Sequence, residues 1–393
     1  MIKILLSLVF LIVISCGVQL QEDNTDHFKN GLKRDEFDWT LTQKVLATYN
    51  QKNVVVSPFF LILMLSILAE AAGKDTSSYQ ELSTGVPNIS NAEKIRELLK
   101  SLMQSNELKF GTSLFVDTFI QPNQKFLAII KALYFSDIES IDFSNPQMAS
   151  NTINAWCASA TNNQLNDIVT SDDVKGSVIL LLNTLYGRWS MPFVESDSDR
   201  QNFHLKSGEN LSVQFMRKTG TFYYHESTEL DTKFLRLPYD GQKFAIYIAL
   251  PNDDGLDELV ARIDRDNFYL TQVLMEKVEV AVSMPKFKFF KNIGLNDILK
   301  YLGIRQIFTN GASFPILARG RSVQDRLQVS NILQKVGIEF YEKESTTNAT
   351  ESGSLVNSSG TAIQFNVNRE FLFLIQDETT GILIFAGIVT NPE

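Results

Sequence analysis

The stretch SVILLLNTLYGRW at residues 177–189 limits the fold more than any other part of the chain. From Val178 it contains only β-branched residues and leucines, and no polar residue appears before Asn183. A strand without polar alternation is typical of a strand that is covered on both faces. We therefore predict a strand here that is buried on both sides.

The remaining patterns divide the chain into an early helical part and a late strand-rich part. A strand at VVV turns at Ser57 and Pro58 into a long helix that is apolar nearly all round, which indicates central burial. Beyond Phe203 the residues alternate between apolar and polar, as in antiparallel strands. Together these patterns predict an α+β fold with more than one sheet.

The chain is predicted to be one large secreted domain. It has 393 residues, of which 44% are hydrophobic, and it contains no Pro/Gly/Ser-rich linker. Lys3, the apolar run 4–14 and the small residues that follow predict a signal peptide over 1–17 and a single domain over 18–393. A lipoprotein acylated at Cys16 is the alternative for this leader, and the glycosylation signals disfavour it.

Charge and cysteine content exclude several classes of partner and chemistry. The net charge is -9 and the basic residues are scattered, so neither nucleic acid nor an anionic membrane surface is expected as a partner. Lys286, Lys288 and Lys291 are interpreted as one solvated face of a strand and not as a heparin site. Without Cys16, only Cys157 remains, which excludes an internal disulfide and is more simply a buried thiol than a nucleophile.

Enzymatic motifs are missing from the sequence. The three histidines, His27, His204 and His225, have no Asp or Cys at metal-ligand spacing. No Gly-x-Ser-x-Gly elbow, phosphate loop or Cys-x-x-Cys motif is found. We therefore expect a protein that is not an enzyme and has no cofactor, no metal and no catalytic residue. Four sequons instead predict surface glycans, at Asn88, Asn210, Asn348 and Asn357.

Several blocks, in order along the chain, resemble those of the serpin family. These are NVVVSPFFLILMLSILAEAAGKDT, IDFSNP, NTLYGRW, FHLKSGENLSVQFM, LPYDGQKFAIYIALPND, MPKFKF, LQVSNILQKVGIE and FNVNREFLFLIQDETTGILIFAG. The resemblance implies three β-sheets, about nine helices and an exposed reactive-centre loop over about residues 342–364. In inhibitory serpins a protease cuts this loop, and the cut segment inserts as a new strand of the main sheet.

The loop departs from the pattern that this mechanism requires. Glu344 stands where the family hinge has glycine, so the backbone is less free to bend. Inward positions after insertion would be Ser345, Thr347, Ala349 and Glu351, and burying Glu351 would cost on the order of several kcal/mol. The hinge residues singled out are Glu342, Lys343, Glu344, Ser345, Thr347, Ala349 and Glu351.

The region that must open during insertion also departs from the family. Gln334 replaces a frequent histidine, and Phe60 replaces a customary serine after Ser57 and Pro58. The block NTLYGRW, which begins at Asn183, is about two residues shorter than usual. These changes predict a sheet that opens poorly.

Two functions remain open, and both concern an extracellular protein partner of a monomer. The first is a non-inhibitory binding, carrier or regulatory protein. The second is a suicide inhibitor of an elastase-like or chymotrypsin-like serine protease, because no Arg or Lys lies near the expected cut. The candidate reactive-centre residues are Val356, Asn357, Ser358 and Ser359. A small-molecule carrier would need an apolar pocket.

Overall fold

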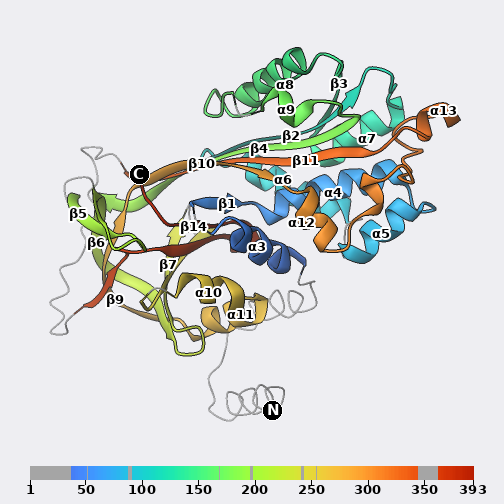
Figure 1. Cartoon of the computed structure of the whole chain (residues 1–393). Coiled ribbons are helices and arrows are strands. Elements are labelled where there is room, and N and C mark those ends of the chain that lie inside the picture. Colours follow the sequence, from blue (N-terminus) through green and yellow to red (C-terminus); the bar gives the residue numbers. More distant parts are fainter. Residues whose placement is uncertain are drawn as a thin grey trace, which may run out of the picture.

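The computed structural model describes residues 37–50, 52–86, 91–167, 169–194, 198–239, 243–253, 255–343 and 362–393. Within these ranges eleven α-helices and fourteen strands form an α+β fold, as the sequence predicts (Figure 1). The helices are α3 (Phe37–Thr48), α4 (Pro58–Ala72), α5 (Ser77–Gly85), α6 (Ala92–Met103), α7 (Gln124–Tyr134), α8 (Pro146–Ala160), α9 (Ser171–Val174), α10 (Leu256–Arg262), α11 (Arg265–Leu274), α12 (Asn296–Tyr301) and α13 (Arg321–Gln324).

A five-stranded sheet occupies the upper part of Figure 1. Its strand order is β10-β11-β4-β2-β3. The strands are β2 (Leu108–Asp117), β3 (Asp137–Ile141), β4 (Ile179–Val194), β10 (Phe287–Gly294) and β11 (Val329–Lys343). The apolar run from Val178 thus becomes β4, near the centre of this sheet. The predicted burial on both sides is confirmed for Leu181 and Leu182, which point to opposite faces and are both buried.

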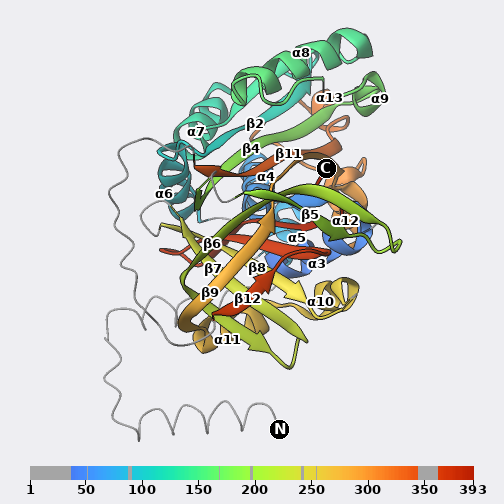
Figure 2. The same cartoon turned by 90° about the vertical axis from the view of Figure 1, so that its left-hand side faces the viewer.

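A nine-stranded sheet occupies the lower part of the molecule (Figure 2). Its order is β1-β14-β13-β8-β7-β6-β9-β12, with β5 paired to β6. The strands are β1 (Val54–Val56), β5 (Asp199–His204), β6 (Asn210–Ser227), β7 (Thr232–Tyr239), β8 (Phe244–Pro251), β9 (Glu276–Pro285), β12 (Ile363–Asn366), β13 (Phe371–Asp377) and β14 (Ile382–Val389). The described strands form two hydrogen-bonded sheets where three were implied, because the long strand β6 pairs with β5, β7 and β9 together.

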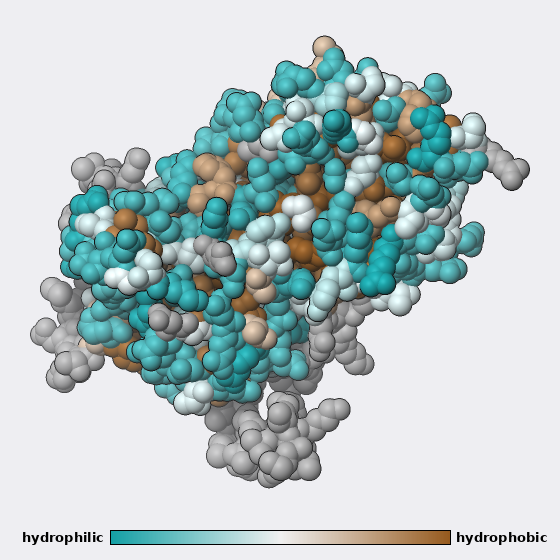
Figure 3. All heavy atoms as spheres, viewed as in Figure 1, coloured by the Kyte–Doolittle hydropathy of each residue, from teal (hydrophilic) through white to brown (hydrophobic). Residues whose placement is uncertain are grey.

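Helix α4 begins where the sequence predicts and lies in the centre of the core. Ser57 caps the helix by accepting a hydrogen bond from the backbone of Phe60, and Pro58 occupies the first turn. Gly73, with φ of +74°, ends the helix. Because α4 is apolar all round, nearly all its side chains are buried between the two sheets. Hydrophilic residues, by contrast, cover most of the molecular face seen in Figure 3.

Helices α8 and α9 cover part of the opposite face of the five-stranded sheet (Figure 1). Ile153 and Cys157 of α8 pack on Leu180 and Leu182 of β4, in a small core of their own. Trp156 of α8 meets Phe115 of β2 edge to face, at 5.4 Å between ring centroids. The upper half of β4 and β11 extends beyond these helices, and there Arg188 is exposed.

Candidate functional site

The candidate site is the seam between β4 and β11, together with the end of β11. The two strands are parallel and are paired from Val329 opposite Ile179 to Lys343 opposite Val194, with two irregularities. The expected loop leaves β11 after Lys343, and the described chain resumes at β12, which pairs with β9 of the other sheet. The two ends of the loop are therefore fixed in different sheets, and the seam is closed along its length.

Glu342, the first predicted hinge residue, is a buried ion-pair partner at the end of β11. Its side chain is 3% exposed, and Oε1 accepts hydrogen bonds from Lys286 and, at 2.9 Å, from Ser198. Burial raises the pKa of this carboxyl, but the hydrogen bonds from Lys286 and Ser198 outweigh burial and hold the pKa below its ordinary value. Oε2 has no partner among the described residues.

Two of the predicted sheet-opening residues, Ser57 and Gln334, form a reciprocal pair. Gln334 Oε1 accepts from the Ser57 amide at 2.7 Å, and Gln334 Nε2 donates to the Ser57 carbonyl at 3.0 Å. Both residues are fully buried. The pair fixes β11 to the start of α4, and both backbone groups of Ser57 depend on it.

The other two predicted sheet-opening residues lie close by without joining this pair. Asn183 of β4 is opposite Gln334 in the strand register, but its Nδ2 donates to Thr112 of β2 at 2.5 Å. Its Oδ1 is buried and has no partner among the described residues. Phe60 is fully buried and packs against Phe110 at 4.7 Å between ring centroids. In this position Phe60 adds apolar packing where the family usually has a hydroxyl.

A cluster on the outer face of the sheet, which the sequence did not reveal, crosses the seam. We call it the seam clamp; its residues are Tyr186 and Arg188 of β4, Glu339 and Tyr341 of β11, and Lys288 of β10. Glu339 accepts from the Tyr186 hydroxyl and, at 3.3 Å, from Arg188 Nε. Lys288 Nζ lies 3.3 Å from Glu339 Oε2. The Arg188 guanidinium also lies over the Tyr341 ring, 4.0 Å from its centroid.

The charge of Glu339 is maintained by these partners. Burial raises the pKa of this carboxyl, but the hydrogen bond from Tyr186 and the charge of Lys288 lead a set of contacts that hold the pKa below the ordinary value. Contacts of Glu339 with Tyr186 and Arg188 join β4 to β11. Opening the seam would therefore separate a charged carboxylate from two of its partners.

A glycine allows two aromatic rings of this face to stack. Tyr186 of β4 and Phe290 of β10 are stacked at 6.4 Å across the intervening strand, over Gly337 of β11. A Cβ at Gly337 would lie 2.8 Å from each ring, which is closer than real contacts allow. The three strands are thus connected over the position at which β11 has no side chain.

A polar hollow of about 440 Å³ lies beside the point where the described chain resumes. It is lined by Gln201, Arg217, Lys218, Thr219, Ala281, Val282, Ser283, Gln364 and Asn366, from β5, β6, β9 and β12. Gln201 Nε2 donates to Ser283 Oγ at 3.0 Å, and Arg217 pairs with Asp199 at 3.0 Å. Because most of the lining is polar, the hollow lacks the apolar surface that a carrier of an apolar molecule needs.

The remaining residues weighed for chemistry lie apart from one another. His204 is exposed at the end of β5, with Nδ1 2.6 Å from Asn210 Oδ1, whereas His225 lies near the far end of β6. Burial lowers the pKa of His225. Cys157 is buried, and burial raises the pKa of its thiol to about 12. Within the described ranges no group of three His, Cys, Asp or Glu side chains could hold a metal ion.

Several predicted positions fall outside the described residues. They are the leader 1–17 with Cys16, His27, Asn88, the hinge residues Glu344, Ser345, Thr347, Ala349 and Glu351, the sequons Asn348 and Asn357, and the reactive-centre candidates Val356, Asn357, Ser358 and Ser359. Of the four sequons, Asn210 is described, and it lies exposed at the start of β6. Among the helices of the described ranges, none has the length and apolar character needed to cross a bilayer.

Comparison with known proteins gives one consistent result. The family model described as Serpin (serine protease inhibitor) matches residues 33–392. A protein of Anopheles gambiae, serine protease inhibitor 2, is 39% identical over 381 residues, which cover 92% of each chain. Antitrypsin of Bombyx mori is 29% identical over 377 residues, 92% of this chain and 94% of the relative.

Solved structures show the same fold. Human thyroxine-binding globulin, in complex with its hormone, superimposes with a TM-score of 0.80 at 23% identity, covering 91% of this chain and 96% of that one. Manduca sexta serpin-12 superimposes with a TM-score of 0.78 at 24% identity, covering 91% and 97%. The fold is therefore shared both with a hormone carrier and with relatives that are named as inhibitors.

Proposed function

Because the chain belongs to the serpin family, we propose that it is a secreted serpin-fold glycoprotein that binds an extracellular partner and does not trap a protease. In this proposal residues 1–17 are removed as a signal peptide, and residues 18–393 act as a monomeric single domain. The family consists of protease inhibitors and not of catalysts, so the expected partner is a protein.

The observation that carries the proposal is the seam clamp. A strand can enter the main sheet only between β4 and β11, and Tyr186 and Arg188 join Glu339 across that boundary. Inserting a strand would break each of these contacts. It would also separate two strands that are paired over almost their whole length.

The sequence that would have to enter the seam adds a second cost. If the chain reversed tightly after Lys343, antiparallel counting would bring Glu351 to the level of Val336 or Gln334 on the core side. Val336 is 1% exposed and Gln334 is 0% exposed. A carboxylate at this depth would cost on the order of several kcal/mol, because Gln334 already bonds to Ser57.

A second function, suicide inhibition, is favoured by the names of the relatives. Serine protease inhibitor 2 and antitrypsin cover nearly the whole chain. In this alternative an elastase-like or chymotrypsin-like protease cuts near Val356 to Ser359 and is trapped when the loop inserts. The two functions make opposite predictions about the stability of the cleaved protein.

The test compares the intact and the loop-cleaved protein. Papain at a low ratio cuts the loop, mass spectrometry locates the cut, and circular dichroism gives the melting temperature of each form. We expect the melting temperature of the wild type to change little, because no strand is added. The variant E344G/E351A, which restores a free hinge and removes the buried charge, should gain stability on cleavage and so serves as the matched control.

Incubation with elastase and with chymotrypsin completes the test. We expect cut protein and free protease on a denaturing gel. A protease complex that resists SDS, or a large gain in melting temperature for the cleaved wild type, would overturn the non-inhibitory function and establish the alternative. Failure of the control variant to gain stability would also count against the argument, because the loop would then not be the obstacle.

A further inference from the structure

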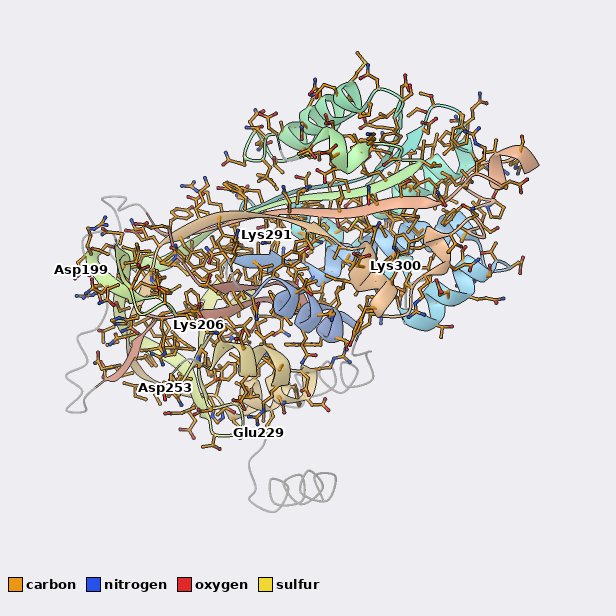
Figure 4. All side chains as sticks on the ribbon, viewed as in Figure 1. Asp199, Lys206, Glu229, Asp253, Lys291 and Lys300 are labelled. Atoms are coloured by element: carbon orange, nitrogen blue, oxygen red, sulfur yellow. The ribbon has the colours of Figure 1, made fainter. Side chains whose placement is uncertain are left out.

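Four lysines from separate parts of the chain form a band on the face shown in Figure 4. The lysine band consists of Lys44 of α3, Lys52 in the turn after α3, Lys291 of β10 and Lys300 of α12. Lys291 and Lys300 are labelled in Figure 4, with α3 drawn between them. The labelled acidic residues Asp199, Glu229 and Asp253 lie away from this band.

The structure corrects the interpretation of the lysines on β10. Lys286 and Lys288 pair with Glu342 and Glu339, on the side of the seam clamp. Lys291 lies three residues beyond Lys288, and this odd spacing turns it to the opposite face of the strand. The three lysines therefore do not share one solvated face, and Lys291 belongs to the lysine band instead.

Three lysines of the band are held over aromatic rings. Lys44 Nζ lies 3.9 Å from the ring centroid of Tyr301, and Lys291 Nζ lies 4.6 Å from that of Tyr49. Lys300 Nζ lies 5.4 Å from the centroid of Phe308. The rings orient the ammonium groups without neutralising them, because a cation–π contact carries no counter-charge. Tyr301 is also 67% exposed, which leaves one ring open to a ligand.

The band carries more positive charge than its described neighbours neutralise. Asp297 lies 3.7 Å from Lys300, with its own side chain 98% exposed, and within the described part of the chain it is the carboxylate paired with the band. Burial lowers the pKa of Lys291, and the like charge of Lys52 lowers it further. Such a concentration of positive charge, on a chain of net charge -9, is suited to a negatively charged ligand.

We propose that the lysine band binds a linear sulfated polysaccharide. The band uses ammonium groups, which accept sulfate oxygens from many directions, and lacks the planar forks with which arginine binds carboxylates. Lysines alternate with ring faces along it, and a sugar chain can place sulfates on the former and its apolar ring faces on the latter. An extended ligand is favoured because the cations come from three elements in a row and not from one pocket.

The test measures the binding of fluorescein-labelled dextran sulfate by fluorescence anisotropy, with the full chain after signal removal. We expect affinity to fall between about 50 mM and about 300 mM NaCl, because exposed ion contacts are screened. The variants K44Q/K291Q and K52Q/K300Q should each bind about tenfold more weakly. The matched control is K125Q/K131Q on α7, which removes the same charge and should change affinity less than about twofold.

Two further measurements separate this ligand from other polyanions. Labelled poly-glutamate should bind at least about tenfold more weakly than dextran sulfate. The variant Y301L should weaken dextran sulfate binding and leave the melting temperature unchanged. Equal affinity for the two polymers would overturn the polysaccharide as ligand. Equal losses in the band and control variants would overturn the band as its site.

Discussion

Tyr186 and Glu339 lie on neighbouring strands, β4 and β11, and the Tyr186 hydroxyl donates a hydrogen bond to Glu339 Oε2 across the seam. This contact lies on the outer face, above the part of the sheet that α8 covers. The reciprocal pair of Gln334 and Ser57 holds β11 from the core side. β11 is thus held from both faces, and substitutions can test each side separately.

Loss of the charge on Glu339 should weaken the closed sheet. We expect E339Q to lower the free energy of unfolding by about 1–3 kcal/mol, because Tyr186 and Arg188 lose a charged acceptor. Urea unfolding followed by tryptophan fluorescence measures the change. The exposed E93Q, which alters a pair at 3.7 Å on α6, is the control and should stay within about 0.5 kcal/mol of the wild type.

The contribution of Glu339 should depend on pH in a defined direction. Its folded-state pKa lies below the ordinary value of 4.5, so unfolding takes up protons when the pH falls below that value. The stability difference between wild type and E339Q should therefore be complete at neutral pH and shrink below about pH 4.5. Urea unfolding of both proteins in acetate and in neutral buffer checks this, and a difference that grows in acid would contradict it.

Removal of the Gln334 amide should be more costly than its small size suggests. We expect Q334L to lower the free energy of unfolding by about 2–4 kcal/mol, because the buried N–H and C=O of Ser57 both lose their partner. Hydrogen exchange at the Ser57 amide should accelerate in the same variant. Q147L on α8 is the control, since Gln147 is exposed and bonds only to exposed Asn151 among the described residues.

Asn210 should carry a glycan when the protein is secreted from insect cells. It is exposed at the start of β6, and its Oδ1 is the atom that lies 2.6 Å from His204, so this contact leaves Nδ2 for attachment. Mass spectrometry should find the glycan in the wild type and in S212T, which keeps the sequon, and none in N210Q or S212A. An unmodified Asn210 in the secreted wild type would show the prediction to be wrong.

Features that depend on nearby residues could be predicted from the sequence. The run from Val178 gives a doubly buried strand, and Ser57 with Pro58 gives the start of α4, because burial pattern and helix capping are local signals. The chemically quiet Cys157 also follows from its apolar neighbourhood. The family assignment adds the order of the strands, which periodicity alone does not determine.

Features that depend on strand register could not be predicted. Tyr186 and Glu339 are 153 residues apart, and only the pairing of β4 with β11 brings them together. The same is true of Lys44 and Tyr301, which meet because α3 and α12 are neighbours in space. No periodic pattern marks such pairs, since each partner is an ordinary polar surface residue in its own segment.

One missing carbon atom decides how the outer face of the sheet is built. Alanine at position 337 would place its methyl group where the rings of Tyr186 and Phe290 now come together over the backbone. A comparison of contacts alone would rank this glycine last in importance, since it offers nothing to touch. The arrangement instead gives a residue without a side chain control over whether three strands share a common aromatic cover, and a methyl group would be enough to lift that cover away.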